Sequence, residues 1–379
     1  MRVVNVVGAR PNFMKMAPLM REMRRHQGIA ATLVHTGQHY DDSMAGQFFR
    51  DLELSPPDIS LEVGSGSHAH QTAEVMKRLE PVLNDIRPHV VVVVGDINST
   101  LAAAITAVKL GIPVAHVEAG LRSFDRSMPE EINRLLTDAI AEYLFVTEDS
   151  GRENLLREGV DGGKIHMVGN VMIDSLEQCR PVWERADVVA RLGLPRGDYG
   201  VVTLHRPSNV DDPATLRGLV KALAEIGRRI PLVFPVHPRT QRRLEAMEAE
   251  TESLGASGAR YLAPLGYLDF IALVAGSRLV LTDSGGLQEE TTALGVPCLT
   301  LREQTERPVT VARGTNRIVG TSPDRIVPEA LRVVSEPRQV FPRPPLWDGH
   351  AAERIVGILR DAFPVIAPAR ARRGEADAG

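Results

Sequence analysis

The sequence predicts an α/β protein with two doubly wound domains, and three observations lead to this expectation. Short valine-rich runs recur along the 379 residues, and they are continuous rather than alternating in polarity, which is typical of parallel strands buried on both faces. Apolar residues at helical spacing separate these runs, as in TLAAAITAVKL at 100–110 and ATLRGLVKALAEI at 214–226. A second series of such units begins after a break near residues 168–180. Strands that alternate with helices in this way form parallel sheets covered by helices.

The expected strands form two series of five. The first series is Val3–Val7, Thr32–His35, His89–Val94, Val114–Val117 and Tyr143–Val146. The second series is Gly200–Leu204, Leu232–Val236, Leu279–Thr282, Cys298–Leu301 and Arg317–Val319. We therefore expect one domain at 1–169, a second at 170–351 and a C-terminal helix at 352–365. The segment 366–379 is rich in small and charged residues, which is typical of a disordered tail.

Composition excludes several classes of protein. The net charge of −4 and the pI of about 6.3 lack the basic excess of most nucleic-acid-binding proteins. Cys179 and Cys298 are far apart, so neither a disulfide framework nor a cysteine zinc site is expected. No apolar run approaches the ~20 residues that span a bilayer, and the N-terminal apolar run is too short for a secretory signal. We expect a cytoplasmic enzyme or binding protein with no nucleic-acid or membrane partner.

Charged and imidazole side chains follow nearly every predicted strand. In the first half they are Arg10, Lys15, Gln38, His39, Asp96, Glu118 and Glu130, and in the second half they are His205, His237, Ser284 to Gly286 and Arg307. Each has a simpler structural explanation, such as helix capping by Asp96 or an ordinary helix opening at Glu130. Ligands of open α/β sheets, however, bind outside the carboxyl ends of the strands. Two such edges that face each other would enclose a cleft rich in acids, bases and cations.

The stretch LTDSGGLQEE, residues 281–290, contains the most distinct local pattern. A strand, a glycine turn and a helix start follow one another there. Unpaired N–H groups at such a helix start bind anions, yet Glu289 and Glu290 come directly after it. Other motifs fail: GSGSHA at 64–69 has no clear surrounding βαβ unit, His68 and His70 lack a third metal ligand, and no phosphate-loop or serine-hydrolase motif occurs.

These motifs, in this order, resemble the non-hydrolysing UDP-N-acetylglucosamine 2-epimerases over roughly residues 1 to 360. The resemblance is carried by GARPNFMKMAPL, TGQHYD, GDINSTLAA, HVEAGLRS, PEEINR, TLHRPSN, PVHPRT, LTDSGGLQEE and TERPVTVARGTNRIVGT. It implies two Rossmann-like domains around a central cleft, the glycosyltransferase B architecture, with a C-terminal helix that crosses back onto the first domain. It also implies a homodimer, a UDP-sugar substrate, and a reaction that requires neither NAD nor a metal.

The resemblance further implies a reaction and a set of site residues. UDP leaves C1 as the C2 proton is removed, a 2-acetamidoglucal forms, and UDP returns after reprotonation on the other face. Asp96, Glu118, Glu130 and His205 match the catalytic positions, with Glu131 as a second choice. Arg10, Lys15 and Arg307 suit the departing UDP; Ser284, Gly285 and Gly286 match phosphate contacts, Glu290 a ribose contact, Phe270 a uracil neighbour, and His237 the histidine of PVHP.

Some members of this family also carry an allosteric UDP-sugar site, and Gln38 and His39 match part of it. The sequence departs from the family after His205-Arg206, where Pro207-Ser208-Asn209 replaces the usual Arg-Glu-Asn or Ala-Glu-Asn. Three other functions are compatible with the same architecture: a hydrolysing 2-epimerase, a glycosyltransferase, and a non-catalytic UDP-sugar sensor. A sensor has no need for Asp96, Glu118, Glu130 and His205 together.

Overall fold

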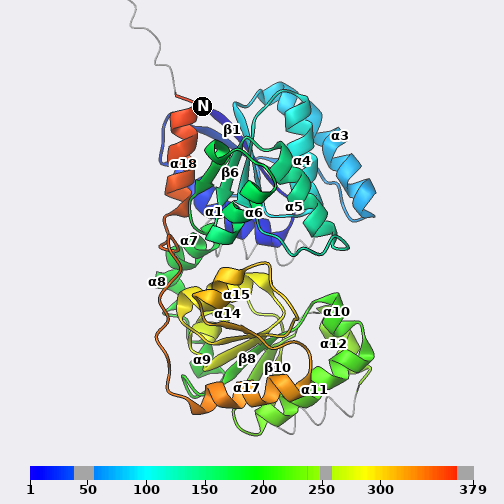
Figure 1. Ribbon diagram of the computed structural model, residues 1–379, viewed down its shortest axis with the longest axis vertical. Coiled ribbons are helices and arrows are strands. Elements are labelled where there is room, and N and C mark those ends of the chain that lie inside the picture. Colours follow the sequence, from blue (N-terminus) through cyan, green and yellow to red (C-terminus); the bar gives the residue numbers. More distant parts are fainter. Residues whose placement is uncertain (38–54, 237, 248–257, 365–379) are drawn as a thin grey trace, which may run out of the picture.

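The structure is a computed structural model that describes residues 1–37, 55–236, 238–247 and 258–364 (Figure 1). Within these residues the strands form two wholly parallel sheets, one of seven strands and one of six. We call them the N-terminal sheet and the C-terminal sheet. The predicted fold class is confirmed, since both sheets are doubly wound and covered by helices.

The N-terminal sheet has the order β3-β2-β1-β4-β5-β6-β7. Its strands are β1 (Arg2–Val7), β2 (Ala30–His35), β3 (Ile59–Ser60), β4 (Val90–Val94), β5 (Val114–Ala119), β6 (Tyr143–Val146) and β7 (Ile165–Met167). Its helices are α1 (Arg10–Arg24), α3 (His68–Ile86), α4 (Asn98–Lys109), α5 (Pro129–Ile140) and α6 (Asp149–Arg157), with a 3₁₀ turn η1 (Gly162–Lys164). All five valines of β4 are buried, as expected for a strand covered on both faces.

The C-terminal sheet has the order β10-β9-β8-β11-β12-β13. Its strands are β8 (Gly200–Thr203), β9 (Leu232–Pro235), β10 (Ala259–Leu262), β11 (Leu279–Thr282), β12 (Cys298–Thr300) and β13 (Asn316–Ile318). The helices of the second part of the chain are α7 (Val171–Gln178), α8 (Arg180–Trp183), α9 (Val188–Arg191), α10 (Pro207–Val210), α11 (Pro213–Gly227), α12 (Pro238–Glu245), α14 (Tyr267–Ala275), α15 (Gly285–Leu294), α16 (Pro308–Ala312), α17 (Pro323–Ser335) and α18 (Ala351–Ala362).

Each of the ten predicted strands coincides with an observed strand to within one or two residues at either end. The prediction omitted β3, β7 and β10, and all three lie at an outer edge of a sheet. Their residues are mostly half-buried or exposed. An edge strand pairs on one side and is partly open to solvent, so its sequence lacks the continuous apolar run that identifies an interior strand.

The last helix, α18, lies beside α1 of the N-terminal half although the chain reaches it from the C-terminal sheet (Figure 1). Asp174 of α7 accepts the backbone N–H groups of Ala351 and Ala352 at 3.1 and 2.7 Å. Trp347 is buried and donates its indole N–H to the carbonyl of Thr147 at 3.1 Å. These bonds supply acceptors for the free N–H groups at the start of α18 and fix the two halves to each other. The expected tail at 366–379 lies outside the described residues.

Candidate functional site

Both sheets place the predicted site residues at their topological switch points. β1 pairs with β2 on one side and β4 on the other, and β8 pairs likewise with β9 and β11. The loops after two such neighbouring strands run in opposite directions, which opens a crevice at the carboxyl edge of the sheet. Asp96 therefore lies beside the start of α1 in one half, and His205 beside the start of α15 in the other.

A single cavity of about 970 Å³ joins these two edges. Its lining includes Lys15, Asp96, Glu130, Arg134, His205, Gly285, Gly286, Glu289 and Arg307. The volume is at the upper end of what ligand and cofactor sites occupy. The two halves thus contribute acids, cations, an imidazole and a helix start to one cleft.

Glu118 is held in an unusual backbone conformation that the sequence does not reveal. Its φ is 71°, and the register of β5 against β6 shifts between Val117 and Ala119. A bulge of this kind redirects a side chain, and a non-glycine residue adopts a positive φ at a cost of order 1 kcal/mol. Glu118 is 6% exposed, pairs with Lys15, and accepts a hydrogen bond from Arg307 at 2.7 Å.

Two cations decide the charge of Glu118. Burial alone would raise the pKa of this carboxyl, but Lys15 and Arg307 outweigh it and hold the pKa below its ordinary value. Because Arg307 belongs to the C-terminal half, this ion pair crosses the cleft. Arg307 also lies 2.9 Å from Glu289, so one guanidinium joins a carboxylate from each half.

Asp96 is held by Arg134, whose Nε and Nη2 donate to the same carboxylate oxygen at 3.0 and 2.6 Å. Its burial acts against ionisation, but Arg134 and then Lys15 hold the pKa of Asp96 below its ordinary value. The N-cap residue of α4 is Ile97, and no side chain caps this helix. Asp96 therefore faces the cleft as a carboxylate rather than acting as a helix cap.

The structure separates the two neighbouring acids of PEEINR. Glu131 is 1% exposed, accepts the N–H groups of Ser123 and Phe124 at 2.9 Å each, and pairs with Arg134. Those bonds occupy both of its oxygens, which makes Glu131 a structural residue. Glu130 lines the cleft and makes no ion pair with any residue that the structure describes.

His205 is oriented by an aspartate that the sequence analysis did not assign. Asp283 is 0% exposed; its carboxylate lies 2.9 Å from Nδ1 of His205 and accepts the backbone N–H groups of His205 and Arg206 at 3.0–3.1 Å. Burial opposes ionisation, but His205 and these N–H groups hold the pKa of Asp283 low. A carboxylate on Nδ1 directs the other ring nitrogen outward, and the half-exposed ring lines the cleft.

The helix α15 begins at the cleft, as the glycine turn predicted. Gly285 and Gly286 line the cavity, and Ser284 precedes them at the helix start. A Cβ atom on Gly285 would lie 2.8 Å from Nη1 of Arg307. The glycine therefore allows the guanidinium to approach the N-terminus of the helix, where both attract anions.

The two acids after this turn lie in different surroundings. Glu289, to which the sequence analysis gave no site role, lines the cleft beside Arg307. Glu290 does not line it; this carboxyl is 6% exposed near Tyr267, and burial raises its pKa to about 8. Phe270 of α14 is half-buried against the hydrophobic core and is also outside the cavity lining.

Several predicted residues fall outside the described part of the chain. Gln38, His39 and His237 are among them, and so is the side chain of Arg10, whose backbone begins α1. His68, for which the sequence offers no third metal ligand beside His70, lines the cleft and hydrogen-bonds to Asn98. No sequence signal pointed to His68, because its place depends on how the start of α3 packs against α4.

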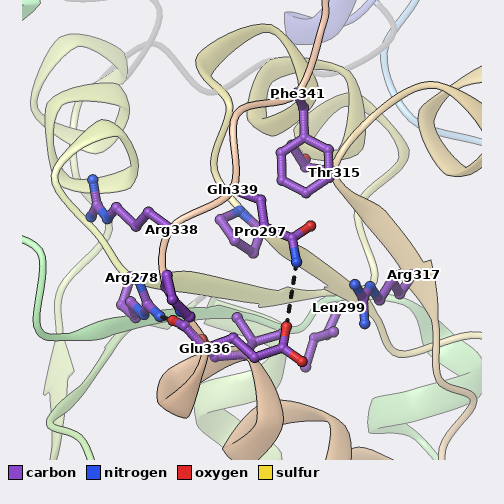
Figure 2. A pocket seen from close by; sticks show the side chains of 11 residues that line it. Arg278, Pro297, Leu299, Thr315, Arg317, Glu336, Arg338, Gln339 and Phe341 are labelled. Atoms are coloured by element: carbon purple, nitrogen blue, oxygen red, sulfur yellow. Dashed lines mark hydrogen bonds between the residues drawn. The ribbon is translucent and has the colours of Figure 1, made fainter.

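Outside the cleft, the features that could indicate another function are a second cavity, a metal site and a membrane-spanning helix. A hollow beside Phe341 and Glu336 has a volume of only about 20 Å³, room for about one water molecule (Figure 2). In the described ranges, no three His, Cys, Asp or Glu side chains are grouped as metal ligands. The described helices are also too short or too polar to cross a membrane.

Comparison with known proteins gives one consistent family. A family model described as UDP-N-acetylglucosamine 2-epimerase matches residues 21–360. The UDP-N-acetylglucosamine 2-epimerase of Methanocaldococcus jannaschii is 41% identical over 364 residues, covering 95% of this chain and 99% of the relative. A UDP-2,3-diacetamido-2,3-dideoxy-D-glucuronate 2-epimerase of Pseudomonas aeruginosa is also 41% identical, over 95% of this chain and 99% of the relative.

A solved structure agrees with this assignment. The crystal structure of the M. jannaschii UDP-GlcNAc 2-epimerase in complex with UDP-GlcNAc and UDP superposes with a TM-score of 0.87, covering 95% of this chain and 100% of that one. The match extends over both sheets and the cleft between them. The chain therefore belongs to the UDP-N-acetylglucosamine 2-epimerase family.

Proposed function

We propose that the protein interconverts UDP-N-acetylglucosamine and UDP-N-acetylmannosamine by the non-hydrolysing route. The observation that carries the proposal is the single cleft in which Asp96, Glu130 and His205 face Lys15, Arg307 and the start of α15. The chemistry needs acids and bases near C2 of the sugar and cations near the departing UDP. Both sets of groups are present, and each set draws on both halves of the molecule.

The reaction has two balanced steps. A base removes the proton from C2, the electron pair of that C–H bond forms the C1=C2 double bond, and the C1–O bond to UDP breaks. In the second step UDP oxygen rejoins C1 while a proton is delivered to C2 on the opposite face. Acid–base help is typically worth roughly 10²–10⁴-fold, and stabilisation of the leaving group is often worth more.

The diphosphate would compete with Glu118 for its cations. Lys15 and Arg307 are both paired with this carboxylate, and a diphosphate beside the N-terminus of α15 attracts the same two groups. As the cations turn to the phosphates, Glu118 becomes a stronger base because they no longer hold its pKa down. In this scheme substrate binding itself prepares one of the acids for proton transfer.

In this proposal His205 acts on the other face of the sugar. Its ring comes from the C-terminal sheet, whereas Asp96, Glu118 and Glu130 come from the N-terminal sheet. An epimerisation needs proton donors and acceptors on both faces of C2, and groups from opposite sides of a cleft meet that need. Asp283 would stabilise the charged ring if His205 takes up a proton.

The test is an NMR experiment in D₂O with UDP-N-acetylglucosamine, without added NAD or metal. The proposal predicts UDP-N-acetylmannosamine with deuterium at C2. Free N-acetylmannosamine as the main product would instead indicate a hydrolysing 2-epimerase. UDP binding without any turnover would indicate a UDP-sugar sensor.

The same experiment should include a second substrate. The M. jannaschii and P. aeruginosa relatives have the same sequence identity to this chain, 41%, but are named for different sugars. UDP-2,3-diacetamido-2,3-dideoxy-D-glucuronate should therefore be compared with UDP-N-acetylglucosamine at equal concentration. A higher kcat/KM for the glucuronate would mean that the protein is a 2-epimerase whose preferred substrate is this sugar rather than UDP-N-acetylglucosamine.

A further inference from the structure

A buried histidine lies behind the acids of the N-terminal sheet, and the mechanism above does not use it. His116 is in the middle of β5, all six of whose residues are buried, and its side chain is 0% exposed. Glu118 stands two residues further along the same strand. His116 is not among the residues that line the cleft, so any influence on the reaction must pass through its neighbours.

Both ring nitrogens of His116 face hydrogen-bond acceptors. Nδ1 lies 2.6 Å from Oδ1 of Asp138, and Nε2 lies 2.8 Å from the carbonyl oxygen of Gly95. A carbonyl oxygen cannot donate, and a neutral imidazole carries a hydrogen on one nitrogen only. Two acceptors are satisfied together only by a ring that carries a hydrogen on each nitrogen, unless the proton lies on Asp138.

The second oxygen of Asp138 argues against that exception. It accepts the N–H of Gly120 at 3.0 Å and lies 2.7 Å from Nη1 of Arg122. Bonds of this kind favour the ionised carboxylate. The carboxyl is 2% exposed, yet despite this burial His116 and Arg122 hold its pKa below the ordinary value. The geometry therefore assigns the proton to the ring.

The charges around the ring are balanced. Asp138 comes from α5, Arg122 from the segment after β5, and Glu158 after α6 pairs with Arg122 at 2.6 Å. Toward the cleft lie Lys15 and Glu118: a Cβ atom on Gly95 would be 3.2 Å from Nζ of the lysine and 3.7 Å from Oε2 of the glutamate. The imidazolium thus contacts the carboxylate of Asp138. Two further acids are close in sequence to the groups described here: Glu118 is two positions after His116, and Asp96 directly follows Gly95.

The pair of His116 and Asp138 joins the two loops that carry these acids. Gly95, with φ 68°, precedes Asp96, and His116 holds its carbonyl oxygen. Gly120, with φ 79°, follows Glu118 by two residues, and Asp138 holds its N–H. Each loop leaves its strand through a left-handed glycine that could rotate freely in isolation. The two hydrogen bonds remove that freedom on both sides at once.

We propose that His116 is a positioning residue that stays protonated in the folded protein and, with Asp138, holds the loops of Asp96 and Glu118 at a fixed separation. The consequence for turnover rests on the proposed function, because proton transfer to and from C2 requires acids held in register. The protonation state of the ring does not rest on it.

The first test is side-chain ¹⁵N NMR of the full chain labelled with ¹⁵N-histidine, at pH 8. His116→Gln identifies the signals of the ring. We expect both nitrogens of His116 to show the chemical shifts of an imidazolium. A neutral pattern for His116 at this pH would overturn the proposal, whether or not the protein is active.

The second test is kinetic. We expect His116→Gln to lower kcat about 10-fold or more while the KM for the UDP-sugar and the Kd for UDP change by less than about 2-fold. His116→Leu should lower kcat further, because glutamine can still donate to Gly95 and leucine cannot. His166→Gln, on β7 of the same sheet, is the matched control, and its kcat should not change. An unchanged kcat in folded His116→Gln would overturn the proposal.

Asp138→Asn provides a second variant if His116→Gln fails to fold. Its amide nitrogen can donate to Nδ1, which leaves the ring neutral with its bond to Gly95 in place. The NMR signals should change to those of a neutral ring, with kcat lowered at unchanged KM. A neutral ring with wild-type kcat would refute a role for the charge. If the wild-type protein itself does not epimerise, the proposed function fails and the NMR result stands alone.

Discussion

The two halves of the cleft have the same strand order but different chemistry. In each sheet the first strand lies between the second and the fourth, so each has a switch point at its carboxyl edge. The N-terminal edge presents two acids to the cleft, Asp96 and Glu130, with Glu118 buried beside them, whereas the C-terminal edge presents a histidine and the start of α15. A shared topology therefore brings both carboxyl edges to one cleft, and the loop residues determine which chemical groups each edge presents there.

The halves also differ in how their charges are compensated. Asp96 and Glu118 are each held by a cation of their own half, Arg134 and Lys15. Arg307 crosses from the other half to Glu118. The charge of Glu118 is thus fully compensated only when the C-terminal edge is in contact with the N-terminal edge. Substitutions on either edge should test this dependence.

The largest effects are expected from two single substitutions, each of which removes one proposed catalytic group from one edge of the cleft. Asp96→Asn and His205→Ala should each lower kcat by at least ~10², because acid–base roles are typically that large. Steady-state kinetics measures the loss, and thermal unfolding shows that the variants remain folded. His350→Ala, an exposed histidine before α18, is the control. Near-normal rates in both variants would refute the site assignment.

A smaller effect, on the affinity for UDP, is expected when Arg307 is replaced. Arg307→Leu should raise the Kd for UDP by roughly 10- to 100-fold, since a hydrogen bond to a charged group is worth about 1.5–3 kcal/mol. Isothermal titration with UDP measures the change. Arg313→Leu removes an exposed arginine that pairs with Asp149 outside the cleft and should leave the Kd unchanged. Equal affinity of Arg307→Leu and the wild type would mean that the phosphates bind elsewhere.

A pH-dependent effect is expected where Glu148 meets the other half. This buried carboxyl follows β6, accepts the N–H of Val309 at 3.4 Å, and has its pKa raised to about 7, mainly by burial. A raised pKa means that folding favours the protonated form, so this contribution is complete below about pH 4.5 and is lost as pH rises through about 7.

Glu148→Gln should therefore be more stable than the wild type at pH 8, by about 1–2 kcal/mol, and should lose that advantage at pH 5. Thermal unfolding of both proteins across this range is the measurement. The raised pKa of Glu290 acts in the same direction in both proteins, so the difference between them isolates Glu148. A constant difference at all pH values would contradict the prediction.

The smallest effect is expected at the start of α15. Gly285→Ala adds a Cβ atom 2.8 Å from Nη1 of Arg307, and the long side chain can move aside at modest cost. We expect the KM for the UDP-sugar to rise a few-fold with kcat nearly unchanged. Gly357→Ala in α18, where no heavy atom lies within 4 Å of the new group, controls for a general effect of alanine. A loss of kcat instead would indicate that the helix start acts in the chemical step.

Much of this could be predicted because it depends on local pattern. Interior strands are recognised by continuous valine runs such as that of β4, and the helix start at Gly285 by its strand and glycine turn. Placement of Lys15 and Asp96 at one carboxyl edge, and of His205 and Arg307 at the other, follows from the rule that ligands bind at carboxyl ends. The edge strand β10 was omitted because partial exposure removes the pattern on which that recognition depends.

The remaining features depend on contacts between residues far apart in the sequence. Glu130 and Glu131 are adjacent and chemically alike, and only the bonds of Glu131 to the loop at 123–124 show which one is structural. Asp283 lies within the stretch LTDSGGLQEE, but its contact with His205 depends on the pairing of β8 with β11. The bulge that turns Glu118 toward Lys15 could not be predicted, because the residue with the positive φ is a glutamate and not a glycine.

The sequence by itself determined the fold class, the family and the kinds of chemical groups in the cleft, because strand and helix periodicity and short motifs are properties of neighbouring residues. Only the tertiary structure decided which acids are paired, which face the cleft, and how His116 and Arg307 hold them. The physical reason is that pKa and side-chain orientation depend on burial and on charges a few ångströms away. Those neighbours come from other helices and loops, and Arg307 and Glu118 are 189 positions apart in the sequence.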